Sequence, residues 1–308
     1  MEKTQCALCE AEEDFQILYP ASFSLRKIDP AVFSARRRPD QVHYRIIKCR
    51  RCGLVRSHPV FSSQKLKRLY QQSQVTYQKE IPYLKKTYGY YLKKILPWLP
   101  RKETLLEIGC ANGFFLQQAQ ALGFQRVYGV EPSQKAVKQA PRKLQKKIIN
   151  DFFQKNLFPD NYFDLICSFQ TLDHLVEPGG FLKEIRKILK PRGCLLLIVH
   201  DVDSLGARLF GEKWPIFDIE HLYLFNQKTL KQILIKNQFQ ALASFKIFNQ
   251  YPLAYWLRMS PLSAKLKKQV GRWLKSWHLA RIPISLPAGN LGLLARKSSP
   301  GSPYRPGI

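Results

Sequence analysis

The fold of this chain is decided by one short stretch of sequence, Glu107-Ile108-Gly109-Cys110-Ala111-Asn112-Gly113. An apolar run over residues 104–108 predicts a strand that leads into it, and helical spacing over 114–122 predicts a helix directly after it. Gly109 permits a tight turn, Gly113 permits close approach of the backbone to a ligand, and the helix N-terminus offers N–H donors. Ala111 stands where a nucleotide-binding loop usually has glycine. On this stretch alone, an ordinary strand-to-helix turn remains the alternative.

Outward from this loop, short apolar runs alternate with amphipathic helices. Strands are predicted at residues 104–108, 126–130, 147–149, 163–168 and 194–200, and helices at 114–122, 134–139, 181–189 and 228–236. Runs that are apolar at nearly every position are typical of strands buried on both faces, and strand–helix alternation is typical of parallel sheets. We therefore expect an α/β fold with a doubly wound, Rossmann-like sheet.

Acidic residues follow the next two predicted strands. Glu131 comes 22 positions after Gly109, at the end of the strand at 126–130. An acid at that place can accept both hydroxyls of a ribose. Asp151 follows the strand at 147–149, where Asn150-Asp151-Phe152 could bind an adenine amino group and stack on its ring. The order and spacing of these features favour nucleoside binding over an ordinary turn.

The ordered set of motifs resembles the class I methyltransferases. Residues 105–113 look like their first motif, 129–133 like their acidic ribose-binding motif, and 163–166 with 172–175 like their fourth-strand motif. Residues 189–199 resemble their turn into the fifth strand and that strand itself. The resemblance implies S-adenosylmethionine as the cofactor and a seven-stranded sheet whose last strand, at 292–296, is antiparallel. The cofactor-binding residues implied are Glu107, Gly109, Cys110, Ala111, Asn112, Gly113, Glu131, Pro132, Asp151, Phe152, Phe169 and Gln170.

An NAD-dependent dehydrogenase is the rival interpretation, because its glycine loop is similar. A short-chain dehydrogenase would also carry a Tyr-x-x-x-Lys pattern well after that loop. In this chain the pattern at Tyr90 to Lys94 lies before the loop and on another element. The sequence therefore favours the methyltransferase.

Four of the seven cysteines form two Cys-x-x-Cys pairs, Cys6 with Cys9 and Cys49 with Cys52. Thiolates at this spacing can bind one tetrahedral ion, and two such pairs complete a closed zinc site. Glu10 stands where glycine is usual after the first pair, and the 39 intervening residues exceed what a minimal zinc ribbon needs. Pairs of this kind ahead of a methyltransferase core resemble the zinc-binding module of methyltransferases that act on sugars, including sugar C-methyltransferases. We expect the zinc to be structural, since four thiolates leave no open position for catalysis.

Histidine is the expected base for the proton that a methyl acceptor loses. Residues 220–225 resemble the segment of sugar C-methyltransferases whose Glu-His pair is implicated in proton abstraction. The resemblance makes His221 the first candidate, with Glu220 or a backbone group orienting its ring and Tyr223 bonding the substrate. His174 and His200 follow predicted strands and are alternatives, and a purely positional role for His221 also stays open. Residues 214–217 depart from the sugar C-methyltransferase pattern, so both O- and C-methylation remain possible.

The formal net charge of +28 at pH 7 is the most unusual bulk property. A field of that size favours nucleic acid, anionic membranes or phosphorylated substrates, although basic residues spread along a chain also fit a general surface bias. No Asn/Asp-Pro-Pro-Tyr group follows the strand at 163–168, and the chain has no Pro-Cys pair of the kind nucleic-acid methyltransferases use. We expect a small or sugar-like acceptor. A nucleic-acid methyltransferase and a non-catalytic, zinc-dependent nucleic-acid-binding protein are the alternatives.

Residues 261–279 predict a basic amphipathic helix. Leu266, Trp273 and Trp277 share helical spacing, and lysines and arginines lie between them. Such a helix packs on the core or over the substrate cleft, or it docks on an anionic membrane and brings a lipid-linked acceptor within reach. The sequence leaves both interpretations open.

The chain divides into a zinc-binding module at 1–61, a helical connector at 62–100, the methyltransferase domain at 101–296 and a disordered, Ser/Pro/Gly-rich tail at 297–308. Within the connector, residues 65–96 predict one helix. The longest apolar run is too short to span a bilayer, and the acidic N-terminus does not resemble a secretory signal peptide. Because the remaining cysteines lie in apolar stretches and need no disulfide, we expect a cytoplasmic protein.

Overall fold

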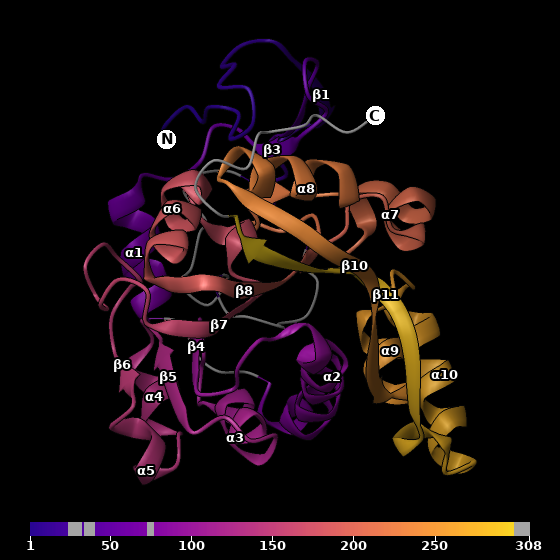
Figure 1. Cartoon of the computed structure of the whole chain (residues 1–308). Helices are drawn as coiled ribbons and strands as arrows, with labels where there is room; N and C mark the ends of the chain where they lie inside the picture. Colours follow the sequence, from indigo (N-terminus) through magenta and orange to yellow (C-terminus); the bar gives the residue numbers. More distant parts are fainter. Residues whose placement is uncertain (24–32, 34–40, 73–76, 299–308) are drawn as a thin grey trace.

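The computed structural model describes residues 1–23, 33, 41–72 and 77–298 of the 308-residue chain. At its centre lies a seven-stranded sheet (Figure 1). All neighbouring strands from β8 to β6 are parallel, whereas β11 is antiparallel to β8 and β10. This topology confirms the doubly wound, seven-stranded fold and its antiparallel last strand. From edge to edge, the strands are β10 (Phe239–Pro252), β11 (Pro283–Lys297), β8 (Leu189–His200), β7 (Phe163–Phe169), β4 (Thr104–Ile108), β5 (Arg126–Val130) and β6 (Ile148–Ile149).

Helices cover both faces of this sheet. In Figure 1, α6 and α8 lie above it, whereas α2 and α3 lie below it. The four predicted helices of the methyltransferase domain correspond to α3, α4, α6 and α8. The helices around the sheet are α2 (Ile81–Ile95), α3 (Phe114–Ala121), α4 (Gln134–Lys138), α5 (Arg142–Gln145), α6 (Pro178–Ile188), α7 (Leu205–Phe210) and α8 (Gln227–Lys236).

Side chains of β8 alternate between two hydrophobic cores, one on each face. Leu195, Leu197 and Val199 belong to the core that contains residues of α6 and α8. Leu196 and Ile198 belong to the core that contains residues of α2 and α3. Because successive side chains of a strand point to opposite faces, a strand covered on both sides must be apolar at every position. This is why the strands appear as unbroken apolar runs in the sequence.

The prediction of one connector helix over residues 65–96 is wrong. A first helix, α1 (Ser63–Gln72), is separate from α2, which follows the short 3-10 turn η3 (Gln78–Glu80). Pro82 in the first turn of α2 explains the new start. Proline lacks the N–H that would continue an earlier helix, but it fits a first turn, where that group has no intrahelical partner. Residues 73–76 lie outside the described chain.

The N-terminal module contains a four-stranded antiparallel sheet whose last strand comes from the methyltransferase domain. Arg56 is buried in this module, and its guanidinium donates hydrogen bonds to the carbonyl oxygens of Thr4 and Glu12. Because the last strand of this sheet comes from the methyltransferase domain, the predicted boundary at residue 61 separates two units that share one sheet. Its strands are, in order, β1 (Phe15–Tyr19), β2 (Ile46–Cys49), β3 (Val55–Ser57) and β9 (Tyr223–Leu224).

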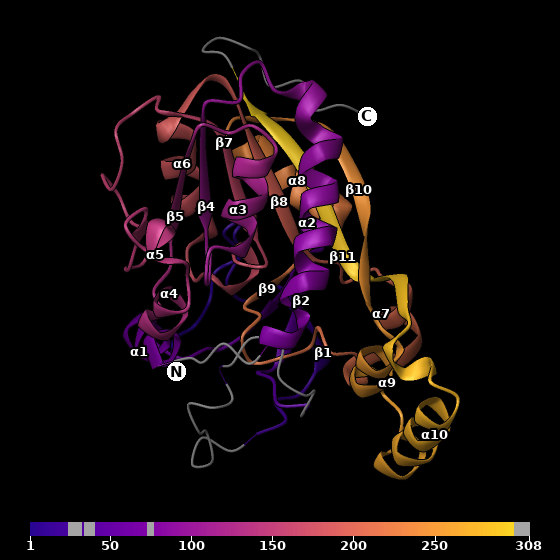
Figure 2. The same ribbon diagram turned by 90° about the horizontal axis from the view of Figure 1, so that it is seen from below.

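A long hairpin formed by β10 and β11 makes one edge of the central sheet, and only part of β11 was predicted. Between its strands lie α9 (Leu253–Met259), α10 (Ala264–Ser276) and the turn η7 (Leu279–Arg281). These elements project from the body of the protein (Figure 2). α10 falls within the helix predicted at 261–279. Every helix in the described chain is too short or too polar to span a bilayer.

The start of the predicted disordered tail is also corrected. Lys297 ends β11, and its ammonium group donates hydrogen bonds to the carbonyl oxygen of Leu189 and to Oδ1 of Asn161. Residue 297 is therefore part of the sheet. The rest of the predicted tail, from residue 299 onward, lies outside the described residues.

Candidate active site

A cavity of about 680 Å³ opens at the carboxyl ends of the parallel strands. The strand order reverses between β4 and β7, and doubly wound sheets bind ligands at such a point. The wall combines α1, the ends of β4, β5, β7 and β8, the loop before β9, and the region around α9. Most of the predicted site residues line it, namely Glu107, Gly109, Ala111, Glu131, Pro132, Phe152, Phe169, Gln170, His174, Glu220 and His221.

The turn after β4 requires glycine at its first position. Gly109 has a φ of +81°, and a Cβ there would lie 2.5 Å from Oγ1 of Thr171. Its N–H donates to the carbonyl oxygen of Val130 at 2.9 Å, which ties the turn to the end of β5. Ala111 also adopts a left-handed φ of +47°. That conformation costs a residue with a side chain about 1–2 kcal/mol, so this loop stores backbone strain where it borders the cavity.

Glu131 holds this strained loop in place. Its carboxylate accepts hydrogen bonds from the N–H groups of Ala111 and Ser133, each at 2.8 Å. Burial raises the pKa of Glu131, while these two N–H donors act in the opposite direction. A carboxylate has about four acceptor positions. Glu131 can therefore support the loop and accept the hydroxyls of a ribose at the same time.

Glu107, at the end of β4, is a buried carboxyl group that lacks a partner for one oxygen. Its Oε2 makes no hydrogen bond to any described residue. Burial and the negative charge of Glu131 together raise the pKa of Glu107 well above its usual value. A nearby cation would stabilise the ionised form. Because S-adenosylmethionine carries an ammonium and a sulfonium group, this pair of carboxylates fits that cofactor.

The remaining loop residues predicted to bind the cofactor do not line the cavity. Cys110 is buried against β5, where its Sγ lies 2.5 Å from the position of a Cβ on Gly129. Gly113 begins α3 with a φ of +71°, and a Cβ there would lie 3.3 Å from the side chain of Ile148. The left-handed backbone at this position favours glycine, and the side chain of Ile148 leaves little room for a larger residue. The Oδ1 atom of Asn112 is buried and accepts no hydrogen bond from the described residues.

Asp151 likewise lies outside the cavity wall. Its exposed carboxylate accepts hydrogen bonds from the N–H of Phe152 at 2.7 Å and from Nε2 of Gln154 at 3.2 Å. The contact between Asp151 and adenine stays a prediction. Phe152 does line the cavity and offers a ring on which a base could stack.

Three histidines and an aspartate meet on the other side of the cavity. Asp173 and His174 belong to the turn η5 (Leu172–His174), His200 ends β8, and His221 precedes β9. Nδ1 of His200 lies 2.6 Å from Oδ2 of Asp173. The ring centroid of His221 lies 4.1 Å from that of His200 and 5.0 Å from that of His174. Ligand atoms of Asp173, His200 and His221 also lie within 4.8 Å of one another, close enough to share a metal ion.

Burial controls the charge of this cluster. Desolvation lowers the pKa of His221 well below its usual value, and it lowers the pKa of His174 in the same direction. Burial opposes ionisation of Asp173, but its hydrogen bond with His200 and the field of the histidines hold its pKa well below the usual range. At neutral pH the cluster therefore combines an ionised Asp173 with uncharged His174 and His221.

The ring of His221 is oriented so that one nitrogen can accept a proton. Its Nδ1 lies 2.8 Å from the carbonyl oxygen of Ile216. Since a carbonyl oxygen only accepts, Nδ1 carries the hydrogen and Nε2 keeps its lone pair. A backbone group, rather than the side chain of Glu220, therefore orients the ring. The carbonyl oxygen of His221 accepts a hydrogen bond from Oγ of Ser57 at 2.8 Å, so the N-terminal module fixes this segment.

Tyr70 is a site residue that the sequence did not reveal. Its hydroxyl lies 3.2 Å from Nδ1 of His174 and donates to the carbonyl oxygen of Glu220 at 3.3 Å. It comes from α1, and no motif in that part of the chain singles it out. Tyr223, for which a substrate contact was predicted, does not line the cavity. Its hydroxyl donates to the carbonyl oxygen of Gln5 at 3.0 Å, within the N-terminal module and outside the cavity wall.

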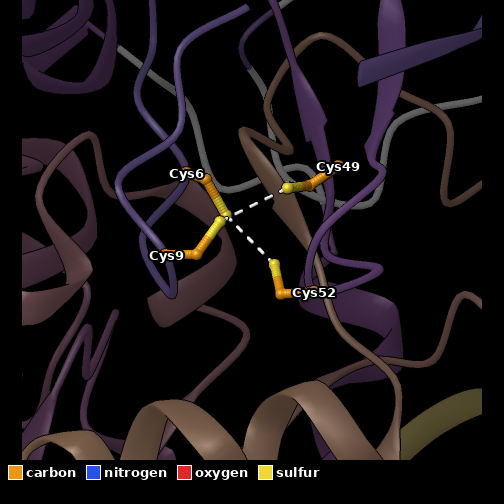
Figure 3. A group of neighbouring side chains, drawn as sticks. All are labelled: Cys6, Cys9, Cys49 and Cys52. Carbon is orange, nitrogen blue, oxygen red and sulfur yellow. Dashed lines mark hydrogen bonds between the residues drawn. The ribbon is translucent and has the colours of Figure 1, made fainter. Parts of the chain in front are cut away.

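The four paired cysteines form a second candidate site (Figure 3). The Sγ atoms of Cys6 and Cys52 lie 3.3 Å apart, and those of Cys9 and Cys49 lie 3.4 Å apart. All four sulfurs lie within 4.8 Å of one another. Tetrahedral zinc with Zn–S bonds of about 2.3 Å separates its sulfurs by about 3.8 Å. The cluster therefore has the size and the donor atoms of a four-thiolate zinc site.

Comparison with known proteins gives a family and several relatives. Residues 77–244 match a family model described as a methyltransferase domain. The ubiquinone biosynthesis O-methyltransferase of Bradyrhizobium diazoefficiens is 30% identical over 97 residues, which cover 30% of this chain and 38% of that protein. The tRNA U34 carboxymethyltransferase of Alteromonas mediterranea is 29% identical over 122 residues, which cover 36% of this chain and 37% of that protein. The chain spans less than half the length of the curated relatives it matches.

A solved structure shows the same fold. The SAM-dependent methyltransferase from Archaeoglobus fulgidus aligns with a TM-score of 0.50 and 16% identity, covering 73% of this chain and all of that one. At this identity the likeness concerns the fold alone, but the family model covers more than half of the chain. Fold, cavity and family model agree. The chain therefore belongs to the methyltransferase-domain family.

Proposed function

We propose that this enzyme methylates an oxygen or a carbon of a small or sugar-like acceptor, and that His221 removes the acceptor's proton. The observation that carries this proposal is the buried His221, which lines the same cavity as Glu107 and Glu131 and whose Nδ1 is held by the carbonyl oxygen of Ile216, while burial lowers its pKa well below the usual value. When bound, S-adenosylmethionine supplies an electrophilic methyl group on its sulfonium.

The two sides of the cavity have different chemistry. On one side, Glu131 would accept the ribose hydroxyls, Phe152 would stack on the adenine, and Glu107 would balance the positive charge of the cofactor. Phe169 and Gln170, at the end of β7, complete the wall between this side and the histidines. The histidine side is therefore left for the acceptor.

The acceptor side carries hydrogen-bonding groups suited to a hydroxylated ligand. Tyr70, Asp218 and Glu220 line the cavity together with His221. As the acceptor gains the methyl group, its O–H or C–H proton passes to Nε2 of His221. The resulting imidazolium is stabilised by the ionised carboxylate of Asp173 in the same cluster, because an opposite charge nearby favours the protonated ring.

We also propose that Cys6, Cys9, Cys49 and Cys52 hold a structural zinc. The ion would stabilise the N-terminal module, and Ser57 of that module anchors the carbonyl group of His221. Zinc would therefore position the base without entering the reaction. We also propose a reducing, cytoplasmic location, because zinc would take four of the seven cysteines and the other three, Cys110, Cys167 and Cys194, are buried without a disulfide to any described residue.

A nucleic-acid acceptor is the second candidate. The net charge of +28 and the tRNA-directed relative favour it. Membership of the methyltransferase-domain family disfavours the third interpretation, a non-catalytic, zinc-dependent binding protein, which would not bind S-adenosylmethionine. The two acceptor classes can be separated by asking which fraction of a cell extract becomes methylated.

The test uses S-adenosylmethionine with a tritiated methyl group and an extract separated into RNA, lipid and small-molecule fractions. Label in the small-molecule or lipid fraction supports the proposal, and label confined to RNA supports the second candidate. His221→Asn is expected to bind the cofactor normally by calorimetry and to lose roughly 10²–10⁴-fold in labelling rate. An unchanged rate would remove His221 as the base.

A matched control is His278→Asn. His278 is exposed, and its left-handed φ of +58° suits asparagine. This substitution should leave both cofactor binding and labelling rate unchanged. Failure of the unmodified protein to bind S-adenosylmethionine would overturn the proposal as a whole.

A further inference from the structure

The hairpin insertion of α9, α10 and η7 carries an apolar surface that no described element covers. Of the residues in α10, only Leu274 is buried, and α9 contains no buried residue. Both helices project beyond the central sheet (Figure 2). The large, exposed hydrophobic side chains of this region are Leu262, Leu266, Trp273, Trp277, Ile282 and Leu286.

These side chains form a stripe along α10. Leu266, Trp273 and Trp277 stand seven and four positions apart, and at about 100° per residue they share one face of the helix. The two tryptophans are 55% and 65% exposed, and their ring centroids lie 6.1 Å apart. A helix packed on the core would bury this face, so the core-packing interpretation of residues 261–279 does not account for it.

The charge around the stripe has one sign. The exposed basic residues of α10 include Lys265, Lys268, Arg272 and Lys275. No aspartate or glutamate occurs after Glu220 in the sequence, so nothing in the insertion offsets these charges. Exposed tryptophans beside lysines and arginines are typical of helices that lie in the headgroup region of an anionic bilayer. A nucleic-acid duplex would satisfy the charges, but its bases are stacked on one another and would leave the tryptophan stripe in water.

The same apolar surface continues into the active-site cavity. Leu262 and Leu286 are each 41% exposed, and both also line the cavity. Trp256 and Met259, at the end of α9, extend this wall inward. An apolar chain that leaves the cavity would therefore meet the exposed face of the insertion without crossing a polar rim at these residues.

We propose that the α9–α10 insertion docks on an anionic membrane surface and presents the cavity to an acceptor carried on a lipid. Docking itself is independent of the reaction, whereas the lipid-linked acceptor rests on the methyl transfer proposed above. The stripe supplies the apolar contact, the basic residues supply attraction to anionic headgroups, and the continuous wall of the cavity supplies a path for the lipid.

The test is co-sedimentation of the whole chain with vesicles at low ionic strength. We expect binding to vesicles of phosphatidylglycerol and phosphatidylcholine in equal parts, and little binding to vesicles of phosphatidylcholine alone. The double variant with Trp273→Ser and Trp277→Ser should bind the mixed vesicles more than about tenfold more weakly, because it loses most of the exposed apolar stripe. Lys268→Gln and Lys275→Gln should each weaken it roughly fivefold, and added salt should reduce the difference.

Matched controls lie elsewhere on the surface. Trp98→Ser removes a tryptophan that is 44% exposed outside the insertion, and Lys143→Gln with Lys146→Gln removes two exposed charges in and just after α5. These variants should bind vesicles like the unmodified protein. If the unmodified protein ignores the mixed vesicles, or if the double tryptophan variant binds them equally well, the proposal fails. Binding to a short RNA duplex that the lysine substitutions abolish, without vesicle binding, would also overturn it.

Docking and methyl transfer can fail separately. Cofactor binding by calorimetry should be unchanged in the double tryptophan variant, because neither tryptophan lines the cavity. His221→Asn should bind vesicles normally. Tritium in the lipid fraction that depends on the two tryptophans would support both proposals, and vesicle binding by a protein that leaves all lipids unlabelled would support docking while refuting the lipid-linked acceptor.

Discussion

Glu131→Gln is the substitution that tests the cofactor site most directly. The carboxylate of Glu131 accepts an N–H from the strained loop at Ala111 and a second N–H from Ser133, each at 2.8 Å. Glutamine has almost the same shape but keeps only one acceptor oxygen and no charge. Its amide nitrogen would therefore face one of these two N–H donors.

The size of the effect follows from these contacts. A hydrogen bond to a charged group contributes about 1.5–3 kcal/mol, and a donor left buried without a partner costs about 1–3 kcal/mol. Release of a buried charge offsets part of this loss, since burial already raises the pKa of Glu131. We expect the free energy of S-adenosylmethionine binding to weaken by about 1–3 kcal/mol, which corresponds to roughly 5–150-fold in Kd.

Calorimetric titration with S-adenosylmethionine measures this change, and a thermal melt without cofactor checks folding. Glu103→Gln is the matched control, because Glu103 lies next to the opposite end of β4 and pairs with Lys190 at 3.4 Å. It should bind the cofactor normally. If Glu131→Gln folds and binds with unchanged affinity, Glu131 does not contact the ribose, and the assignment of this side of the cavity is refuted.

Three further predictions concern the metal, the base and the loop. Elemental analysis should find about one zinc per chain, and Cys49→Ser should lower thermal stability and turnover more than the core substitution Cys167→Ser; a metal-free protein that folds fully would contradict this. Burial lowers the pKa of His221 below its usual value of 6.5. Turnover should therefore stay constant as the pH falls to about 6.5, and it should decline only at lower pH, where the neutral ring becomes protonated. A decline that begins above pH 7 would point to another base. Gly109→Ala should lower the free energy of unfolding in urea by more than the roughly 1–2 kcal/mol that its left-handed conformation costs an alanine. The control Gly123→Ala, at φ +97° with nothing within 4 Å of the new Cβ, should show that conformational cost alone. Equal losses would mean that the contact with Thr171 relaxes freely.

Local pattern was sufficient to predict the sheet and the cofactor side of the cavity. The strands β4, β5 and β7 are mostly apolar because helices cover both faces of the sheet, and this preference is visible in consecutive residues. Gly109 and Glu131 lie directly at strand ends, so their positions in the cavity follow from the positions of the strands. The two Cys-x-x-Cys pairs likewise carry their geometry in their spacing, and the structure brings them together.

Prediction was poorer where one part of the chain depends on a distant part. Gly113 fits a glycine motif, yet it has a left-handed φ of +71° and does not line the cavity, and Asp151 forms a local turn outside the cavity wall. Tyr223 lies beside a catalytic candidate in the sequence, but the pairing of β9 with β3 directs its hydroxyl to the N-terminal module.

The sequence by itself determined the doubly wound sheet, the glycine turn, the position of Glu131 at the end of a strand beside the cavity, and the cysteine pairs, because each depends on residues that are close in the chain. Only the tertiary structure decided that Tyr70, His174, His200 and His221 meet, since these come from α1, η5, β8 and the segment before β9. It also decided that the α9–α10 insertion lies at the cavity and leaves its tryptophans exposed. Such contacts form when separate elements pack together, and no local periodicity records which distant partner a side chain will meet.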